Sequence, residues 1–524
     1  MINKQSHFSP IIFSVILIFG IFIGKTLTYD DIQKQDLNKF NLVLSQLEEA
    51  YVDSIDRDEL IEKAVTNLLK ELDPHTYYIN AKDLITVNEP MEGSFDGIGI
   101  EFNLIDDTIL VIAPISGGPS QSVGILSGDK IICVDSDTIA GIGLKNEDVF
   151  SLLRGKKGTK VNLSVFRKGE KNLLDFEITR DKIPIYSVDV SYMIDNKTGY
   201  IKINRFASNT YREFLNATKK LLNNGMESLV LDLRNNPGGY LESAINICNE
   251  FLDKNLLIVY TKNRSGERTE YFSNDKGLLI DMPVKVIIDE GSASASEIVA
   301  GALQDNDRGT IIGRRSFGKG LVQEQFENYD GSAYRITTQR YYTPTGRCIQ
   351  RPYIKGQGDT YGRDFLERLN NGELLSIDSI QFNDSLKFTT NKGKVVYGGG
   401  GIMPDIFIPL DTLSYHHSIS KAIRKDFIRQ FAFKYTNKNR SKLELQNLAH
   451  FISLFEITSA DFEDFTEYCK SKDLFVPISK LSDYDKKILS TQLKAYIARN
   501  IWNDEGFFPI IHKIDYTFQE ALLK

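Results

Sequence analysis

The chain has 524 residues, enough for two to four domains, and 41% of them are hydrophobic while 25% are charged, as in ordinary globular proteins. The formal net charge of −7 gives no reason to expect a nucleic-acid partner, which usually needs a basic surface. Four widely spaced cysteines and six histidines match neither a zinc-site pattern nor a dense disulfide framework, and we expect no metal and no cofactor.

The first segment, residues 8–24, is almost entirely apolar, with Lys4 before it and Lys25 after it. Such a run predicts either a signal peptide or an uncleaved membrane anchor. We favour an anchor in residues 1–28, because no small-x-small cleavage site directly follows Gly24. Both interpretations predict export, with the rest of the chain on the extracytoplasmic, periplasmic side of the cytoplasmic membrane.

Helical spacing of apolar residues predicts two helical stretches between about residues 36 and 70. A proline turn at Pro74 ends this pattern, and we assign residues 29–92 to an N-terminal helical region. Its apolar face suits packing on the core or on a second copy of the chain, so a homo-oligomer is one expectation. We interpret His75, beside the proline turn, as structural.

Short strands and glycine-rich turns replace the helical pattern between Gly93 and Arg180. This pattern resembles a PDZ domain, which we assign to residues 93–181. The loop Gly97-Ile98-Gly99-Ile100 stands where that family binds a peptide carboxylate. Glycine lets backbone N–H groups converge on a carboxylate, and an exposed strand edge can pair with an extended peptide.

Strands and helices alternate between residues 183 and 410. Apolar runs at 229–233, 256–260 and 284–288 predict strands, and helices are expected at 241–252 and from Ser294 onward. This order predicts an α/β core, residues 182–410, with a mainly parallel sheet covered by helices. Asp330-Gly331 predicts a hairpin turn before a strand at 332–342.

The remaining residues, 411–524, predict a mainly helical extension, with helices at 418–435 and 483–500. No chemical motif occurs in this extension, and its role is left open. We interpret Trp502, the single tryptophan of the chain, as a packing residue.

A cluster of small hydroxyl residues, Gly291-Ser292-Ala293-Ser294-Ala295-Ser296-Glu297, lies where the strand at 284–288 turns into a helix. Backbone N–H groups and the helix dipole favour negative charge at such a position, which suits a nucleophile. Ser294 followed by Glu297 is also a capping box, which needs no function beyond starting a helix. Composition and spacing do not select one of the three serines.

Two chemistries are open for Gly318-Lys319-Gly320. With Gly313 it begins a G-x-x-x-x-G-K phosphate loop, but Gly320 offers no hydroxyl for Mg²⁺ and a strand is predicted to follow where that loop needs a helix. The alternative is a Ser–Lys pair, in which the lysine is the base. Its pKa must then fall from about 10.4 to roughly 7–8, which requires burial. An exposed turn lysine is the non-catalytic interpretation.

The order of several motifs over residues 37–410 resembles that of the carboxyl-terminal processing peptidases, also called tail-specific proteases. The motifs are Leu72-Asp73-Pro74-His75, the PDZ segment, Leu231 to Gly239, Gly291 to Glu297, Phe317 to Gly320, Tyr341 to Arg347 and Gly399 to Asp405. The extension after residue 411 is not covered by the resemblance.

The resemblance implies a serine endopeptidase whose nucleophile is Ser294 and whose base is Lys319, assisted by Gln323. Lys319 would take the proton of Ser294, which attacks a peptide carbonyl and forms an acyl-enzyme that water releases. The oxyanion would be bound by backbone N–H groups of Ala295 and of the Gly238-Gly239 turn.

The expected partners are protein or peptide substrates with exposed C-termini, which the PDZ domain would bind. The alternative function is a membrane-anchored PDZ scaffold that captures peptides and carries a silent protease core.

Overall fold

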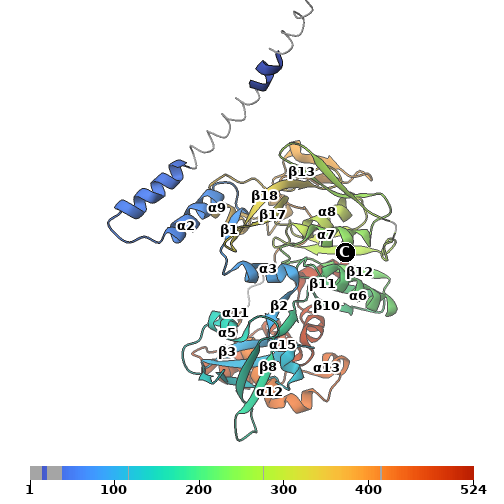
Figure 1. The fold of residues 1–524 in the computed structure, drawn as a ribbon. Helices are drawn as coiled ribbons and strands as arrows, with labels where there is room; N and C mark the ends of the chain where they lie inside the picture. Colours follow the sequence, from blue (N-terminus) through green and yellow to red (C-terminus); the bar gives the residue numbers. More distant parts are fainter. Residues whose placement is uncertain (1–13, 21–37, 116, 275, 413–415) are drawn as a thin grey trace, which may run out of the picture.

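The structure is a computed structural model that describes residues 14–20, 38–115, 117–274, 276–412 and 416–524. In Figure 1 the predicted PDZ region lies at one end of the molecule and the predicted core lies at the other, while the helix of residues 38–50 extends away from both. The predicted anchor lies outside the described residues, except for the helical residues 14–20. Across the described ranges, each helix is too short or too polar to span a bilayer.

Two helical stretches come first, as predicted: residues 38–50, and α2 (Arg57–Lys70). The Asp56 carboxylate begins α2 by accepting hydrogen bonds from the N–H groups of Asp58 and Glu59, at 3.0 and 3.1 Å. Strand β1 (Tyr77–Ile79) then pairs with a strand of the core, and α3 (Leu84–Glu92) leads into the PDZ region.

The predicted PDZ region is a small antiparallel sheet around its own apolar core. The strand order is β3-β4-β5-β7-β8, with β6 beside β5, and β2 pairs separately with β9. Strand β3 is therefore at the edge of its sheet. The elements are β2 (Ser94–Gly97), β3 (Ile100–Ile105), β4 (Thr108–Pro114), α4 (Pro119–Ser122), β5 (Lys130–Val134), β6 (Asp137–Thr138), α5 (Asn146–Leu153), β7 (Lys160–Phe166), β8 (Leu174–Thr179) and β9 (Asp181–Pro184).

A six-stranded sheet, in the order β10-β11-β12-β15-β16-β21, forms the centre of the predicted core. Neighbours from β11 to β21 pair in parallel, and β10 pairs antiparallel with β11. Helices α6, α7 and α8 bury one face of this central sheet in the largest apolar cluster. The elements are β10 (Val188–Met193), β11 (Thr198–Ile203), α6 (Thr210–Asn223), β12 (Ser228–Asp232), α7 (Leu241–Asn249), β15 (Val284–Ile288), α8 (Ala295–Asp305), β16 (Thr310–Gly313) and β21 (Ile406–Phe407).

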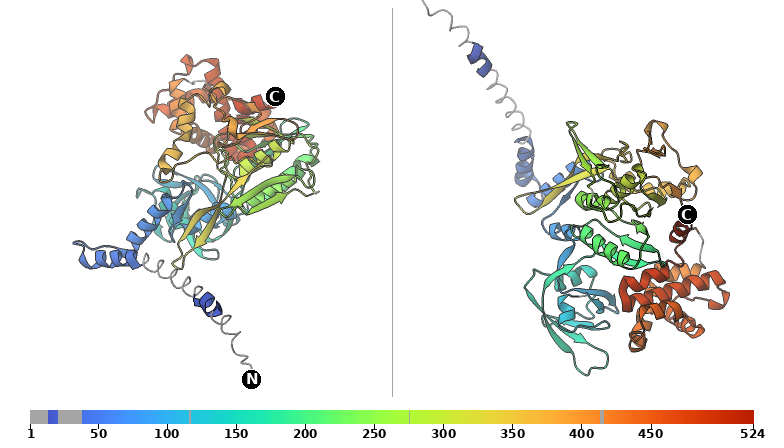
Figure 2. Two further views of the ribbon diagram at one scale, coloured as in Figure 1. Left: turned by 90° about the horizontal axis from the view of Figure 1, so that it is seen from above. Right: turned by 90° about the vertical axis from the view of Figure 1, so that its right-hand side faces the viewer.

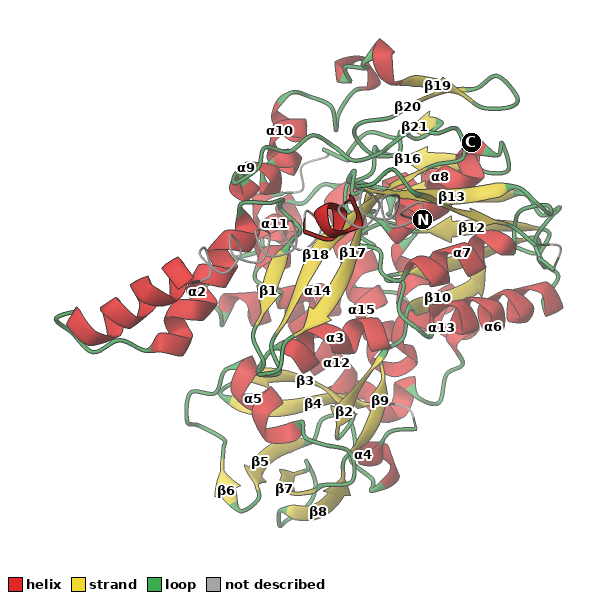
Figure 3. Cartoon of the chain, turned by 45° about the horizontal axis from the view of Figure 1, so that its top comes forward, coloured by secondary structure: helices red, strands yellow, loops and turns green. Residues whose placement is uncertain are grey.

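A second, antiparallel sheet lies in the core, and it corrects the prediction of a mainly parallel sheet. It contains β1, β18, β13 and β14 in that order, with β17 also paired to β18. Figure 3 shows β1, β18 and β17 side by side. The predicted turn at Asp330-Gly331 joins β17 to β18, and such hairpins pair antiparallel, whereas helix crossovers give parallel pairs. Across the described residues most strand pairings are antiparallel, and parallel pairing is confined to the central sheet. The remaining elements of the core are β13 (Leu257–Asn263), β14 (Arg268–Phe272), β17 (Leu321–Glu327), β18 (Ala333–Tyr342), α9 (Gly358–Gly362), α10 (Asp364–Asn370), β19 (Lys387–Thr389) and β20 (Val395–Tyr397).

The C-terminal extension is helical, as predicted, but its helix bounds differ. The helix expected at 418–435 is two helices, because Asp426 has a positive φ of 59° and interrupts it. The helix expected at 483–500 continues to Ile511 beyond a kink at Trp502 and Asn503. The helices are α11 (His417–Arg424), α12 (Phe427–Leu443), α13 (Leu448–Leu454), α14 (Ser459–Lys470), α15 (Asp483–Ile511) and α16 (Tyr516–Leu523).

The extension contacts both other parts of the molecule (Figure 2). Arg440 of α12 donates a hydrogen bond to the Ser127 hydroxyl of the PDZ region at 2.7 Å. Helix α16 packs Phe518 and Ala521 against Tyr200, Val230 and other apolar residues on the second face of the central sheet. The central sheet is thus covered on one face by core helices and on the other by the extension.

Candidate active site

Ser294 lies in the sharp turn between β15 and α8. Its backbone, with φ 53° and ψ −112°, is in a region that residues with a Cβ rarely adopt. Its N–H donates a hydrogen bond to the Glu297 carboxylate at 2.8 Å. Strain of this kind persists only where the surrounding structure enforces it, and it is often found at functional sites.

The three serines of the turn differ in what their side chains do. Ser292 and Ser296 are fully buried, and their hydroxyls donate to the carbonyls of Leu233 at 2.8 Å and Asn236 at 3.0 Å. Ser294 instead lines a cavity of about 630 Å³. Ser292 and Ser296 therefore hold the turn in place, and Ser294 faces the space that a substrate could enter.

Lys319 lines the same cavity from the loop that precedes β17. Its Nζ donates a hydrogen bond to Gln323 Oε1 at 2.7 Å. Burial lowers the pKa of Lys319, and the positive charge of Arg335 lowers it further, against the opposing charges of Glu297 and Asp73. The shift has the direction that a lysine base requires.

Glu297 connects the turn that carries Ser294 to the loop that carries Lys319. Its fully buried carboxylate accepts hydrogen bonds from the N–H groups of Gly318 at 2.7 Å and Lys319 at 2.9 Å, and from the Ser316 hydroxyl at 2.5 Å. Burial raises the pKa of Glu297, and these hydrogen bonds oppose that rise. The capping box predicted from sequence is present, but its acidic residue also fixes the loop that carries Lys319.

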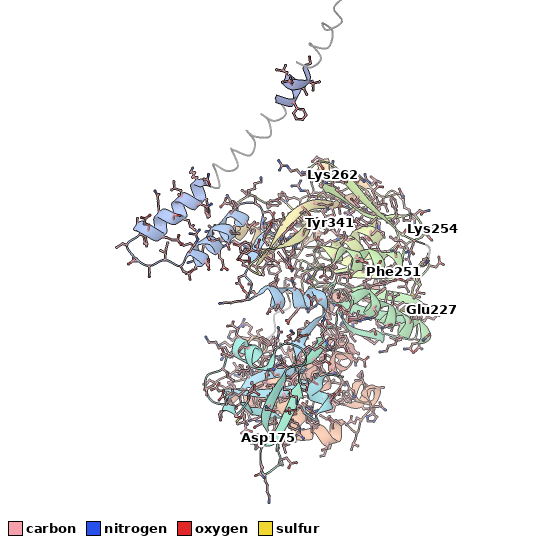
Figure 4. The ribbon with its side chains drawn as sticks, viewed as in Figure 1. Asp175, Glu227, Phe251, Lys254, Lys262 and Tyr341 are labelled. Carbon is pink, nitrogen blue, oxygen red and sulfur yellow. The ribbon has the colours of Figure 1, made fainter. Side chains whose placement is uncertain are left out.

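Tyr341 makes a second connection between the two loops, and sequence reasoning gave it no role. Its hydroxyl donates to the Ser294 carbonyl at 3.0 Å and also contacts the Lys319 carbonyl. Figure 4 labels Tyr341 on β18, far from Asp175 of the PDZ region. The signal was present in the motif Tyr341 to Arg347, but the pattern does not say which tyrosine turns inward.

The Gly238-Gly239 turn lines the cavity beside Ser294. Gly238 has a φ of 95°, and a Cβ at this position would lie 2.7 Å from Ser294 Cβ and 2.8 Å from Ala295 N. The Gly238 N–H donates to Asn236 Oδ1 at 2.9 Å. The N–H groups of Gly239 and Ala295 have no hydrogen-bond acceptor among the described residues.

His75, which we interpreted from the sequence as structural, lies at the candidate active site. It lines the Ser294 cavity and also a neighbouring cavity of about 660 Å³, which shares Pro237 and Lys319 with the first. Its carbonyl accepts a hydrogen bond from Gln323 Nε2 at 2.5 Å, and its Nε2 lies 3.1 Å from Tyr361 Oη. Burial lowers the pKa of His75 to about 4, so the ring is neutral at pH 7.

The predicted site residues therefore form two groups. Ser294, Lys319, Gln323, Gly238 and Gly239 line one cavity, with Ala295 next to Ser294. The loop from Gly97 to Ile100 lies in the PDZ region and does not line that cavity.

The PDZ loop has its own features. The N–H groups of Ile98 and Gly99 have no hydrogen-bond acceptor among the described residues. Strand β3, which follows, is at the edge of its sheet, and its Phe102 lies with its ring centroid 5.7 Å from that of Phe150 on α5. A free strand edge, two available N–H groups and an aromatic pair thus occur together.

Comparison with known proteins identifies three regions. Residues 97–178 match the PDZ domain, residues 197–357 match peptidase family S41, and residues 418–503 match a family of unknown function. The first two matches lie within the predicted PDZ domain and core, whose bounds at 93–181 and 182–410 stay predictions.

Relatives match over more of the chain. The carboxy-terminal processing protease CtpA of Bacillus subtilis is 36% identical over 61% of this chain and 68% of its own length. The carboxy-terminal-processing protease of Bartonella bacilliformis is 39% identical over 60% of this chain and 73% of its own length. Among solved structures, the photosystem II D1 C-terminal processing protease is 26% identical over 72% of this chain and 88% of that chain, with a TM-score of 0.37.

The matches to the peptidase and PDZ families and to the relatives from Bacillus and Bartonella agree with each other and with the order of motifs in the sequence. The chain belongs to the carboxy-terminal processing proteases of peptidase family S41, and it is a serine-type peptidase with a PDZ domain.

Proposed function

We propose that this protein is an endopeptidase in which Ser294 is the nucleophile and Lys319 the general base, and which selects substrates by their C-terminal tails. The observation that carries the proposal is the meeting of Ser294, Lys319 and Gln323 in one cavity, with the lysine buried and its pKa lowered. A strained serine and a buried lysine with a lowered pKa, both lining one cavity, are the components that a Ser–Lys mechanism needs.

In the proposed reaction, neutral Lys319 accepts the proton of Ser294 as Oγ attacks the carbonyl carbon of the scissile peptide bond. Lys319 then gives this proton to the leaving amine, and the acyl-enzyme remains on Ser294. A water molecule, deprotonated by Lys319, releases the acyl group. Gln323 keeps Nζ in position through its 2.7 Å hydrogen bond.

The oxyanion requires backbone donors beside Ser294. Ala295 N–H is one, at the start of α8, where the helix dipole also favours negative charge. Gly239 N–H is the better second donor, because the Gly238 N–H is already bound to Asn236.

The tail of the substrate would bind to the PDZ domain. Its carboxylate would accept hydrogen bonds from the N–H groups of Ile98 and Gly99, and its backbone would extend the sheet at β3. An apolar side chain would fit beside Phe102 and Phe150. We further propose that this reaction takes place outside the cytoplasm, which the apolar N-terminal segment supports. Association through the N-terminal helices stays a prediction.

The test is cleavage of an unfolded protein with an apolar C-terminal tail, compared with the same protein carrying a charged tail. Wild-type protein should cleave the first substrate faster, and Ser294→Ala and Lys319→Ala should each lower kcat/KM by about 10⁴-fold or more. Cleavage by Ser294→Ala at the wild-type rate would show that Ser294 is not the nucleophile. Tail binding without cleavage by the wild type would instead support a PDZ scaffold with a silent core.

Tail selection has its own test, in which a labelled apolar peptide is titrated into Ser294→Ala. Binding should weaken strongly when the peptide carboxylate is amidated, because the neutral amide lacks the negative charge that strengthens the hydrogen bonds from these N–H groups. Equal binding of the amidated peptide would exclude the Gly97 to Ile100 loop as the carboxylate site.

A further inference from the structure

The C-terminal extension reaches the loop that carries Gly238 and Gly239, which includes one of the two proposed oxyanion donors. This loop begins at Arg234, directly after Asp232 and Leu233 at the end of β12. The Arg234 guanidinium contacts the Asp515 carboxylate at the start of α16, with NH1 to Oδ1 at 3.0 Å and NH2 to Oδ2 at 2.8 Å. Both side chains are mostly buried, with 15% and 22% of their surface exposed.

Arg234 stands between two carboxylates. Its Nε and NH2 also donate to Asp232, whose side chain is fully buried and accepts a further hydrogen bond from Tyr200 Oη at 2.8 Å. Burial alone would raise the pKa of Asp232, but the charges of Arg234 and Lys202 hold it well below its usual range. Asp515 therefore supplies the second negative charge of a partly buried group of two cations and two anions.

The far end of the loop is attached to the serine turn. The Asn236 carbonyl accepts hydrogen bonds from the Ala293 N–H at 2.9 Å and from the Ser296 hydroxyl at 3.0 Å. The Asn235 N–H donates to Asp289 at 2.9 Å. The loop is thus held by the active site at one end and by the extension, through Arg234, at the other.

We propose that Asp515 is a positioning residue for catalysis, which acts through Arg234 on the loop that carries Gly238 and Gly239. The helical extension then helps to set the geometry of the catalytic site. This inference rests on the proposed function, because it assigns the loop to oxyanion binding. It adds a residue outside the segments matched by the peptidase, PDZ and unknown-function families.

The substitution Asp515→Asn tests the ion pair without removing the helix cap. Asp515 also accepts a hydrogen bond from the Phe518 N–H at 3.0 Å, and asparagine caps helices about as well as aspartate. The substitution therefore keeps α16 capped and removes the charge that faces Arg234. Because Arg234 keeps Asp232 as a partner, we expect the chain to fold.

The matched control is Glu505→Gln. Glu505 forms an exposed pair with Lys220 at 2.9 Å, which also joins the extension to the core but does not involve the loop. The full-length variants are compared for kcat and KM on the tail-bearing substrate, for binding of the labelled tail peptide and for melting temperature.

Asp515→Asn should lower kcat about tenfold and leave KM and tail binding unchanged, because a shifted oxyanion donor weakens transition-state binding. Asp515→Glu, which restores the charge, should recover most of the lost kcat, and Glu505→Gln should match the wild type. A kcat for Asp515→Asn equal to that of Glu505→Gln would overturn the proposal, as would a loss that tracks unfolding or KM. Activity retained by Ser294→Ala would instead overturn the proposed function itself.

Discussion

Lys319 owes its low pKa first to burial and then to Arg335, so a new charge beside Nζ should change it predictably. In Gln323→Glu, a carboxylate replaces the amide oxygen that accepts the 2.7 Å hydrogen bond from Nζ. A carboxylate stabilises the ammonium form and raises the pKa of Lys319. The acid limb of kcat/KM should therefore move to higher pH, and activity at pH 7 should fall.

The control for this substitution is Gln323→Leu, which removes the hydrogen bond without adding charge. Its rate should fall, but its acid limb should not move to higher pH. A pH–rate profile of Gln323→Glu that keeps the wild-type limb would mean that Lys319 is not the base.

His512 is buried beneath α16, and its Nδ1 lies 2.6 Å from Tyr192 Oη. Burial lowers the pKa of His512 from 6.5 to about 4. Between these values the unfolded chain binds a proton that the folded chain does not, so stability should fall as the pH drops from 6.5 towards 4. The contribution is at most roughly 3 kcal/mol.

Denaturation of the wild type and of His512→Gln at pH 7 and pH 4.5 measures this contribution. His512→Gln should lose less stability between the two pH values than the wild type does. The exposed His450 provides the control, since His450→Gln should keep the wild-type difference. Equal losses in His512→Gln and the wild type would contradict the prediction.

At the scale of elements, the turn after β12 tests how closely the glycine loop approaches the serine. Gly238→Ala adds a Cβ at a φ of 95° and within 2.8 Å of Ser294 Cβ and Ala295 N. Gly225→Ala, after α6, has a similar φ of 88°, but its added Cβ would lie no closer than 3.9 Å to the nearest neighbour, the Asn196 carbonyl oxygen. Both variants should lose about 1 kcal/mol of stability from the positive φ.

Activity should distinguish these two glycine variants. Only Gly238→Ala should lose kcat, by about 100-fold or more, because the added Cβ would push the glycine loop away from Ser294 and Ala295, the proposed nucleophile and oxyanion donor. Cleavage assays beside thermal melts separate the two effects. Wild-type kcat in Gly238→Ala would mean that the loop does not take part in catalysis.

Local sequence signals predicted many elements, because apolar runs and turn residues act over short distances. The strands at β12, β15 and β17 and the hairpin at Asp330-Gly331 follow from such signals. The antiparallel pairing of β1 with β18 joins Tyr77 to Arg335, and no local pattern encodes a contact over that distance in the chain. The break at Asp426 was also not predicted from the sequence, because apolar residues continue at helical spacing across it.

At the scale of the whole molecule, α16 serves as the second cover of the central sheet. Phe518 is buried, stacks on His512 with ring centroids 3.9 Å apart and packs against Tyr200. Phe518→Ala should destabilise the protein by about 3–5 kcal/mol, because it leaves a cavity beneath the sheet. Phe475→Ala, at a phenylalanine that is 67% exposed, should change stability by less than about 1 kcal/mol.

Urea denaturation followed by tryptophan fluorescence and by activity measures both phenylalanine variants. The two probes should give the same transition for Phe518→Ala if the extension and the core unfold together. If Phe518→Ala were as stable as Phe475→Ala, the stability of the core would not depend on its cover by α16.

The order of motifs along the chain indicated the family and the pair Ser294 and Lys319, which the structure brings to one cavity. It did not indicate the Asp515–Arg234 contact or the cover that α16 gives to the sheet. These depend on how a segment without a chemical motif returns to the core, and only the three-dimensional structure contains that information.

If Ser294 is the nucleophile, its side chain carries the acyl ester during turnover, and that ester can be located. The protein is mixed with an activated ester of an apolar peptide, quenched in acid during the first turnover and mapped by mass spectrometry. We predict an ester on Ser294, absent from Ser294→Ala and formed much more slowly in Lys319→Ala. An ester on Ser292 or Ser296, or equal labelling of Ser294→Ala, would show that Ser294 is not the nucleophile.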